Sequence, residues 1–354
     1  MSGSLLNTTA ARVGRWLASP LQPQQYLELI NPLWAASCRG RIEEIRRETA
    51  RAVTLVIRPN GLFRGAVAGQ YVRLGVDVDG VRYWRCYSVT SPQSGSGETF
   101  SVTVGRVDGG RVSTYIQDQL RVGDVIALDQ AAGDFTLPAT PQPLLLISAG
   151  TGITPMIGML RTLVAEGRQA DVVHLHFVPD EEQCLFRDEL RALGRQPGIH
   201  TVQQFTRAGG EHFSAGLLDT VCADWRERLA YVCGPEALMD AVRNHWKNGQ
   251  IESLKEEAFQ PKRAAVPEGA GGTVGFWKAG VEVEAAGDKP LLEVAEEAGL
   301  MPKHGCRMGI CQECVVPLKE GQVRDLQTGE VFGEAGDVVR ICVCAAAGKV
   351  TLDL

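Results

Sequence analysis

The sequence contains no run of about 18 apolar residues, which is the length that a membrane-spanning helix needs. It also has no long apolar stretch near its start that ends in a small-residue cleavage site, so we expect no signal peptide and a cytoplasmic protein. Basic residues are not in excess, because 36 Lys and Arg stand against 42 Asp and Glu and the formal net charge is -6. Nucleic acids usually bind to a basic face, and we therefore expect no nucleic acid among the partners.

What the sequence does contain is length and cysteine. A chain of 354 residues is too long for one small domain and predicts two or three. Structural disulfides are rare in the cytoplasm, so the 10 cysteines need another role. Three of them lie close together near the end of the chain, which indicates a metal site rather than disulfide bridges.

The pattern of apolar residues divides the chain into segments. Short runs separated by glycine turns cover residues 38–139 and predict an antiparallel β-barrel. Strands and helices alternate over residues 140–260, which predicts a doubly wound, parallel α/β domain. Residues 261–271 are rich in Pro, Gly and Ala and predict a linker, and a second β pattern covers residues 272–354. Residues 1–37 form an N-terminal arm, which we interpret as packing on its own domain in preference to binding a membrane or a partner.

The clustered cysteines have the spacing C-x4-C-x2-C at Cys306, Cys311 and Cys314, which is that of plant-type 2Fe-2S proteins. Two irons need a fourth thiolate, and both Cys342 and Cys344 follow. Two residues apart on one strand, these two side chains would point the same way, so periodicity does not choose between them. Zinc sites usually pair C-x2-C with a second C-x2-C or with histidines, and this second half of the motif is missing here.

The end of the chain resembles the plant-type ferredoxins, which carry a Cys-x-Ala segment shortly before a Leu-Asp-Leu-like strand. The segment that begins at Cys344 and ends in VTLDL fits this pattern. The resemblance implies a β-grasp ferredoxin domain and makes Cys342 a buried thiol. It also implies that four thiolates bind a 2Fe-2S cluster, namely Cys306, Cys311, Cys314 and Cys344.

Two motifs in the barrel segment are similar to the flavin-binding motifs of the ferredoxin-NADP reductase superfamily. The first is R-x-Y-S at residues 85–88, and the second is a G-x-x-S segment at residues 110–114. An arginine can pair with phosphates, an aromatic ring can lie against the flavin, and the amides of a helix start can hold a pyrophosphate. The resemblance implies FAD in preference to FMN. The implied flavin ligands are Arg85, Tyr87, Ser88, Gly110, Val112, Ser113 and Thr114.

A glycine-rich turn follows the first apolar strand of the α/β segment. It is not G-x-G-x-x-G, so the dinucleotide fingerprint does not apply, but it resembles the G-T-G-x-x-P motif of the same superfamily. A later Cys-Gly-Pro segment resembles the motif that lies beside the nicotinamide. The implied nucleotide-binding residues are Gly150, Thr151, Gly152, Thr154, Pro155, Gly234 and Pro235.

The resemblance also implies which residues set the geometry of hydride transfer. Glu257 and Phe259 belong to a segment similar to the superfamily's E-x-F motif, and Phe259 would cover the flavin ring. The implied catalytic residues are Ser88, Cys233, Glu257 and Phe259.

The choice between NADPH and NADH depends on a few charges. Thr206 and Arg207 lie where the superfamily often recognises a 2′-phosphate, whereas Asp180, Glu181 and Glu182 would repel this phosphate if they were close to it. We expect NADPH, bound through Arg207, with NADH as the alternative.

Taken together, the motifs identify the chain as a member of the reductase components that serve oxygenases and desaturases. The segments YLELINPLW and GQYVRLGV are most similar to reductase partners of bacterial acyl-CoA and fatty-acid desaturases. The resemblance implies electron transfer from NAD(P)H through FAD and a 2Fe-2S cluster to an oxygenase or acyl desaturase, with membrane contact only through a membrane-bound partner. The alternatives are the reductase of an aromatic-ring or phenylacetyl-CoA oxygenase, and a redox sensor without turnover.

Overall fold

The computed structural model describes residues 28–354 except for residues 170, 260–263, 306, 310 and 311. The chain divides into two compact units. The first consists of Met1–Arg82, Cys86–Cys233 and Ala241–Glu256, and the second of Tyr83–Arg85, Gly234–Asp240 and Glu257–Leu354. The predicted arm lies mostly outside the described residues, as does part of the predicted linker. No described helix has the length and apolar character that a membrane crossing requires.

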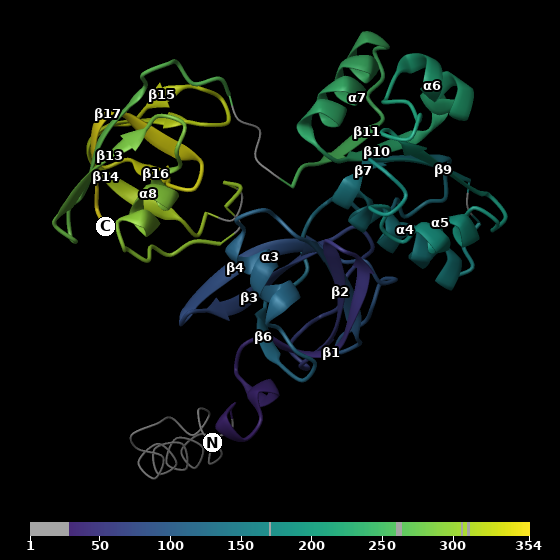
Figure 1. Cartoon of the computed structure of the whole chain (residues 1–354), viewed down its shortest axis with the longest axis horizontal. Helices are drawn as coiled ribbons and strands as arrows, with labels where there is room; N and C mark the ends of the chain where they lie inside the picture. The colour runs from purple at the N-terminus through teal and green to yellow at the C-terminus, as the bar shows by residue number, and fades with distance from the viewer. Residues whose placement is uncertain (1–27, 170, 260–263, 306, 310–311) are drawn as a thin grey trace, which may run out of the picture. The chain divides into compact units, whose positions relative to one another are not determined.

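The first sheet forms the predicted antiparallel barrel (Figure 1). Its strands follow a short 3-10 helix, η1 (Pro32–Trp34), and are β1 (Arg39–Thr49), β2 (Ala52–Pro59), β3 (Tyr71–Val78), β4 (Val81–Ser88), β5 (Phe100–Gly105) and β6 (Val125–Leu128). Their order is β4-β3-β6-β1-β2-β5, and a bridge between Val89 and Val102 joins the end of β4 to β5. Helix α3 (Arg111–Asp118) lies between β5 and β6 in the chain. β-Branched residues dominate β2 and β5, which favours strands over helices.

The second sheet is the predicted parallel sheet, with strand order β11-β10-β7-β8-β9. Its elements are β7 (Leu144–Ala149), η2 (Gly150–Gly152), α4 (Ile153–Ala165), β8 (Val172–Val178), α5 (Arg187–Leu193), β9 (Ile199–Phe205), α6 (Ala215–Val221), η3 (Trp225–Glu227), β10 (Leu229–Cys233), α7 (Glu236–Asn248) and β11 (Leu254–Glu257). Strands β10, β7, β8 and β9 pair in parallel, and every residue of β8 is buried, as expected for a strand that is covered on both faces. Helices α4 and α5 lie on one side of the sheet, and α6 and α7 lie on the other (Figure 1).

The C-terminal sheet is mixed. Its elements are β12 (Gly271–Phe276), β13 (Val281–Ala286), α8 (Leu291–Glu297), β14 (Val315–Asp325), β15 (Val331–Phe332), β16 (Val338–Arg340) and β17 (Cys344–Leu352). Strand β12 pairs in an antiparallel hairpin with β13 and in parallel with β17, which is in turn antiparallel to β14. Helix α8 buries Leu291, Leu292, Val294 and Ala295 in the same core as the sheet. A mixed sheet with one helix confirms the predicted ferredoxin class.

Candidate redox site

Strand β4 carries the three residues of the predicted R-x-Y-S motif. Side chains alternate along a strand, so Arg85 and Tyr87 share one face and Ser88 lies on the other. Ser88 is 3% exposed, and its Oγ is buried without a hydrogen-bond partner among the described residues. A buried hydroxyl without a partner is costly, so this atom fits a polar ligand group such as a flavin edge.

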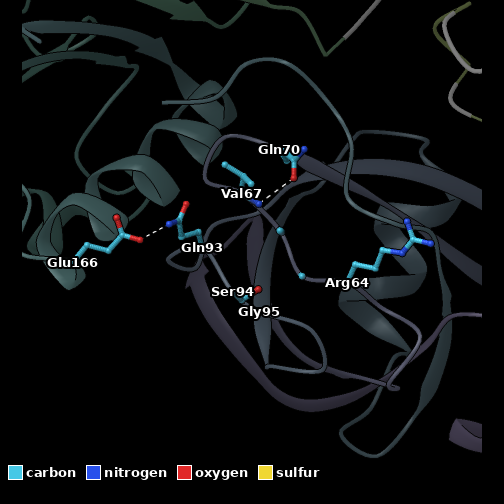
Figure 2. Close-up of a pocket in the computed structure, with 9 residues that line it drawn as sticks. Arg64, Val67, Gln70, Gln93, Ser94, Gly95 and Glu166 are labelled. Atoms are coloured by element: carbon cyan, nitrogen blue, oxygen red, sulfur yellow. Dashed lines mark hydrogen bonds between the residues drawn. The ribbon is translucent and has the colours of Figure 1, made fainter. Parts of the chain in front are cut away.

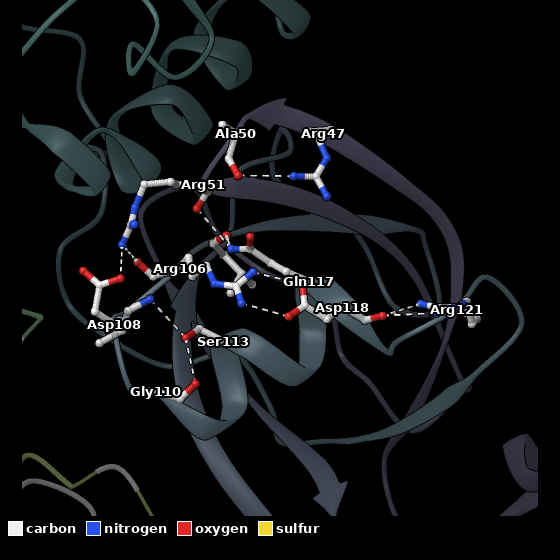
Figure 3. Close-up of polar contacts among 12 residues, drawn as sticks. Arg47, Ala50, Arg51, Arg106, Asp108, Gly110, Ser113, Gln117, Asp118 and Arg121 are labelled. Carbon is white, nitrogen blue, oxygen red and sulfur yellow. Dashed lines mark hydrogen bonds and ion pairs between the residues drawn. The ribbon is translucent and has the colours of Figure 1, made fainter.

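Helix α3 presents its N-terminus as a phosphate cradle. Gly110 is the N-cap and has no side-chain cap, and a Cβ there would lie 2.9 Å from the Oγ of Ser113. That Oγ accepts a hydrogen bond from the amide of Val107 at 3.1 Å, so Ser113 closes the turn that precedes the helix (Figure 3). Val112, in the first turn of the helix, is buried. The uncapped amides and the helix dipole favour an anion at this end.

Two ion pairs that no sequence motif predicts hold the loop before α3. Both Nη atoms of Arg106 donate to the carboxylate of Asp118, at 2.9 and 2.8 Å, and Arg51 pairs with Asp108 at 2.7 Å (Figure 3). The hydrogen bonds from Arg106 lower the pKa of Asp118. The partners are far apart in sequence, so no local motif reveals them.

Five of the predicted nucleotide residues lie in one turn, at Gly150, Thr151, Gly152, Thr154 and Pro155. Gly150 has φ +54, Gly152 caps α4 without a side-chain bond, and the Thr154 hydroxyl donates to the carbonyl of Thr151 at 2.9 Å. Pro155 lies in the first turn of α4, where a missing N–H costs nothing. The backbone amides at this helix start therefore suit a pyrophosphate.

The barrel and the nucleotide sheet contact each other within the first unit. A Cβ on Gly158 of α4 would lie 2.5 Å from the carbonyl oxygen of Val89, the residue after Ser88. A Cβ on Gly105, at the end of β5, would lie 2.7 Å from the Cγ2 of Thr151. These close approaches bring the nucleotide turn to the barrel strands that carry the flavin motif.

Cys233 ends β10, is fully buried, and pairs in register with Ser148 on β7. The Ser148 Oγ lies 2.9 Å from the Nε2 of His174 and 2.9 Å from the Nδ1 of His176, and all three side chains are buried. Burial lowers the pKa of His174 to about 3 and that of His176 to about 4, so both are neutral at pH 7. No sequence motif singled out this group, although histidines at alternate positions of an apolar strand were a signal for it.

Glu257 and Phe259 come at the end of the nucleotide segment, and both belong to the second unit, as do Gly234 and Pro235. The Oε2 of Glu257 is buried without a hydrogen-bond partner among the described residues, and burial raises the pKa of this carboxyl to about 8. Phe259 leaves 39% of its surface exposed. A protonated carboxyl and an open aromatic ring both suit contact with a ring system.

The structure places three of the five candidate cluster ligands, since Cys306 and Cys311 lie outside the described residues. Cys314, Cys342 and Cys344 are buried free thiols. The Cys314 thiol forms a side-chain hydrogen bond with Cys342, which lowers the pKa of Cys314, whereas burial raises the pKa of Cys344 to about 12. The three cysteines belong to one buried core cluster, and sulfur ligands of this kind suit an iron-sulfur cluster.

One expectation about these cysteines is wrong. We expected Cys342 and Cys344 to lie on one strand, but residues 341–343 form a turn, and β17 begins only at Cys344. The two side chains therefore do not share a strand face. Both thiols interact with Cys314, Cys342 through a hydrogen bond and Cys344 through its charge, so these contacts do not choose the fourth ligand.

The backbone around the cluster segment is braced by arginines. Arg307 has φ +59, pairs with Glu296 on α8, and lies 3.2 Å from the Nε2 of His304. Arg340 donates to the carbonyl of Gly309 at 2.9 Å. Amides and cations held near the sulfurs are a means of tuning such a cluster.

A separate pocket of about 430 Å3 opens in the first unit (Figure 2). Its wall includes Gln93, whose side-chain amide donates to Glu166, and Gln70, which accepts from the amide of Val67 at 3.0 Å. None of the residues that line it belongs to the predicted motifs, so we assign it no part in the redox site.

Comparison with known families defines the class of protein. Residues 42–137 match the oxidoreductase FAD-binding domain, residues 146–244 the oxidoreductase NAD-binding domain, and residues 277–347 the 2Fe-2S iron-sulfur cluster binding domain. The chain is thus an oxidoreductase that passes electrons from NAD(P)H through FAD to a 2Fe-2S cluster.

Individual relatives agree. An NADPH oxidoreductase of Mycobacterium tuberculosis is 42% identical over 99% of this chain and 92% of its own length. A stachydrine N-demethylase reductase subunit of Rhizobium meliloti is 29% identical over 81% and 87%. The structure of a phthalate dioxygenase reductase matches with a TM-score of 0.66 and 23% identity over 89% of this chain and 97% of that one. The chain belongs to the ferredoxin-NADP reductase superfamily, in the group with a C-terminal plant-type 2Fe-2S domain.

Proposed function

We propose that this reductase takes electrons from NADPH and delivers them to an acyl desaturase or a related terminal oxygenase. The observation that carries the redox part is the unpartnered hydroxyl of Ser88, buried where the nucleotide helix α4 packs on the end of β4. When bound, FAD accepts a hydride from nicotinamide and the 2Fe-2S cluster carries single electrons onward.

The motifs assign a role to side chains of each unit. Ser88 provides a hydroxyl at the flavin edge, and Glu257 keeps its proton at pH 7 and can donate a hydrogen bond. Cys233 provides a small buried wall at the end of β10, and Phe259 provides a ring that nicotinamide can displace. No general base is required, since a hydride moves between two bound cofactors.

The acceptor class rests on likeness to other proteins. Relatives at 27–29% identity are named as reductase subunits of stachydrine N-demethylase and of glycine betaine monooxygenase. These names support an oxygenase as the second candidate acceptor, beside a desaturase. Reconstitution of the holoprotein with a membrane-bound acyl desaturase and with a soluble oxygenase, each tested for NADPH-dependent product, separates the two. Turnover with neither, together with no reduction of cytochrome c, would instead support a redox sensor.

The fourth cluster ligand is Cys342 or Cys344. Both thiols interact with Cys314, so the proposal of Cys344 rests on the resemblance to plant ferredoxins. Cys342→Ser and Cys344→Ser should therefore be compared by visible and electron paramagnetic resonance spectra. We expect Cys344→Ser to lose the cluster and to retain NADPH-dependent ferricyanide reduction, and Cys342→Ser to keep both. The reverse result would assign Cys342 as the ligand.

A further inference from the structure

The ends of β8 and β9 bring an arginine and three acids to one edge of the nucleotide sheet. The amide of Thr206 donates to the carbonyl of Val178 at 3.0 Å, and the amide of Arg207 donates to that of Pro179 at 2.8 Å. The acids at residues 180–182 follow Pro179 directly. Ligands of open α/β sheets bind outside this carboxyl edge, so these charges share the region where a nucleotide lies.

Two of the three acids already have partners within the protein, through hydrogen bonds for Asp180 and ion pairs for Glu181. Asp180 accepts hydrogen bonds from the amide of Gln183 at 3.0 Å and from its side chain at 2.5 Å. The Oε1 of Glu181 lies 2.6 Å from the Nη2 of Arg191 and 3.3 Å from the Nη1 of Arg187. The carboxylate of Glu181 therefore faces two guanidinium groups of α5.

Helix α5 provides both cations from one face. Arg187 and Arg191 are four residues apart, which places them one turn from each other. Both also contact Asp188, at 3.1 and 3.5 Å. Arg207 is exposed, and among the described residues its guanidinium has no ion pair or side-chain hydrogen bond.

We propose that Arg187 and Arg191 determine the preference for NADPH indirectly, by neutralising Glu181 and so leaving Arg207 free for the 2′-phosphate. The inference rests on the proposed use of NADPH. A phosphomonoester carries a charge of about -1.5 to -2 at pH 7, so an uncompensated carboxylate nearby repels it. NADH has no 2′-phosphate and does not experience this repulsion.

The test compares kcat/KM for NADPH and NADH, with ferricyanide as acceptor, in the FAD- and cluster-loaded protein. Arg191→Gln should lower kcat/KM for NADPH about fivefold and leave kcat/KM for NADH unchanged, since only NADPH carries the 2′-phosphate charge. Glu181→Gln/Arg191→Gln should recover the NADPH value to within about twofold, because the uncompensated charge is gone. Arg195→Gln is the matched control, since Arg195 is exposed just beyond α5 and forms no ion pair among the described residues.

The possible outcomes distinguish a failure of this inference from a failure of the proposed use of NADPH. An Arg191→Gln protein with unchanged NADPH preference overturns the inference. A double variant that stays as weak as Arg191→Gln also overturns it, because Arg191 would then bind the phosphate directly. A wild-type protein that prefers NADH and does not respond to Arg207→Ala overturns the proposed use of NADPH, and the inference falls with it. Melting temperatures should not change, since exposed ion pairs contribute little to stability.

Discussion

Ser88 and Glu257 are the residues whose side chains, without any bound cofactor, most clearly indicate the redox site. Each has a buried side-chain oxygen without a partner among the described residues. Such atoms are rare in folded proteins because each costs free energy unless a ligand or water completes it. Motifs predicted both residues, but only the structure shows that the two oxygens lack partners.

Replacing Ser88 tests its contact with the flavin. Ser88→Ala should slow NADPH-dependent flavin reduction at least about tenfold, the size expected when one hydrogen bond to a buried group is lost. Stopped-flow absorbance of the holoprotein measures this rate. Ser101→Ala is the control, because Ser101 is a buried hydroxyl of the same barrel that is already bonded to Thr90. Equal slowing in both variants would assign the effect to barrel packing.

The carboxyl of Glu257 predicts a pH dependence of stability. Burial raises its pKa from 4.5 to about 8 in the folded protein, so the folded state binds more protons than the unfolded state between these values. The contribution of this residue to stability is therefore fully present below about pH 4.5 and is lost as the pH rises through 8. Glu257→Gln should flatten the fall in melting temperature between pH 5 and pH 8. Parallel curves for the two proteins would show that Glu257 is ionised at neutral pH.

At the scale of elements, the sequence predicts those features that depend on local backbone conformation. The turn from Gly150 to Pro155 was predictable because its glycines and proline have fixed conformational roles. The contact of Cys342 with Cys314 was not predictable, because residues 341–343 form a turn in which side chains do not alternate as they do along a strand. The Ser148 cluster was not predictable either, because it depends on the register between β7 and β8.

The buried histidines of β8 predict acid sensitivity. Burial lowers their pKa values from 6.5 to about 3 for His174 and about 4 for His176, so the unfolded state binds more protons below pH 6.5. Stability is therefore lost as the pH falls from 6.5 towards 4. His176→Asn keeps an acceptor for Ser148 and should reduce the pH slope of the unfolding free energy by about one proton, measured in urea. His200→Gln, an exposed change on β9, should leave the slope unaltered.

At the scale of the whole molecule, the domains act in series, and the cluster is the last carrier in the chain. Cys314→Ser should remove the cluster, reduce NADPH-dependent cytochrome c reduction at least about tenfold, and leave ferricyanide reduction nearly unchanged, because ferricyanide accepts electrons from the flavin. Cys222→Ser is the control, since Cys222 is a buried thiol of the nucleotide domain. Loss of both activities in Cys314→Ser would mean that the flavin domain depends on the cluster for its fold.

The central claim is that electrons pass from NADPH to the flavin and then to the cluster within one chain. The most direct test is anaerobic stopped-flow mixing of the holoprotein with NADPH, followed by freeze-quench electron paramagnetic resonance. The account predicts that flavin absorbance falls first and that a reduced 2Fe-2S signal then rises at a concentration-independent rate. A flavin that is reduced while the cluster remains oxidised would contradict it.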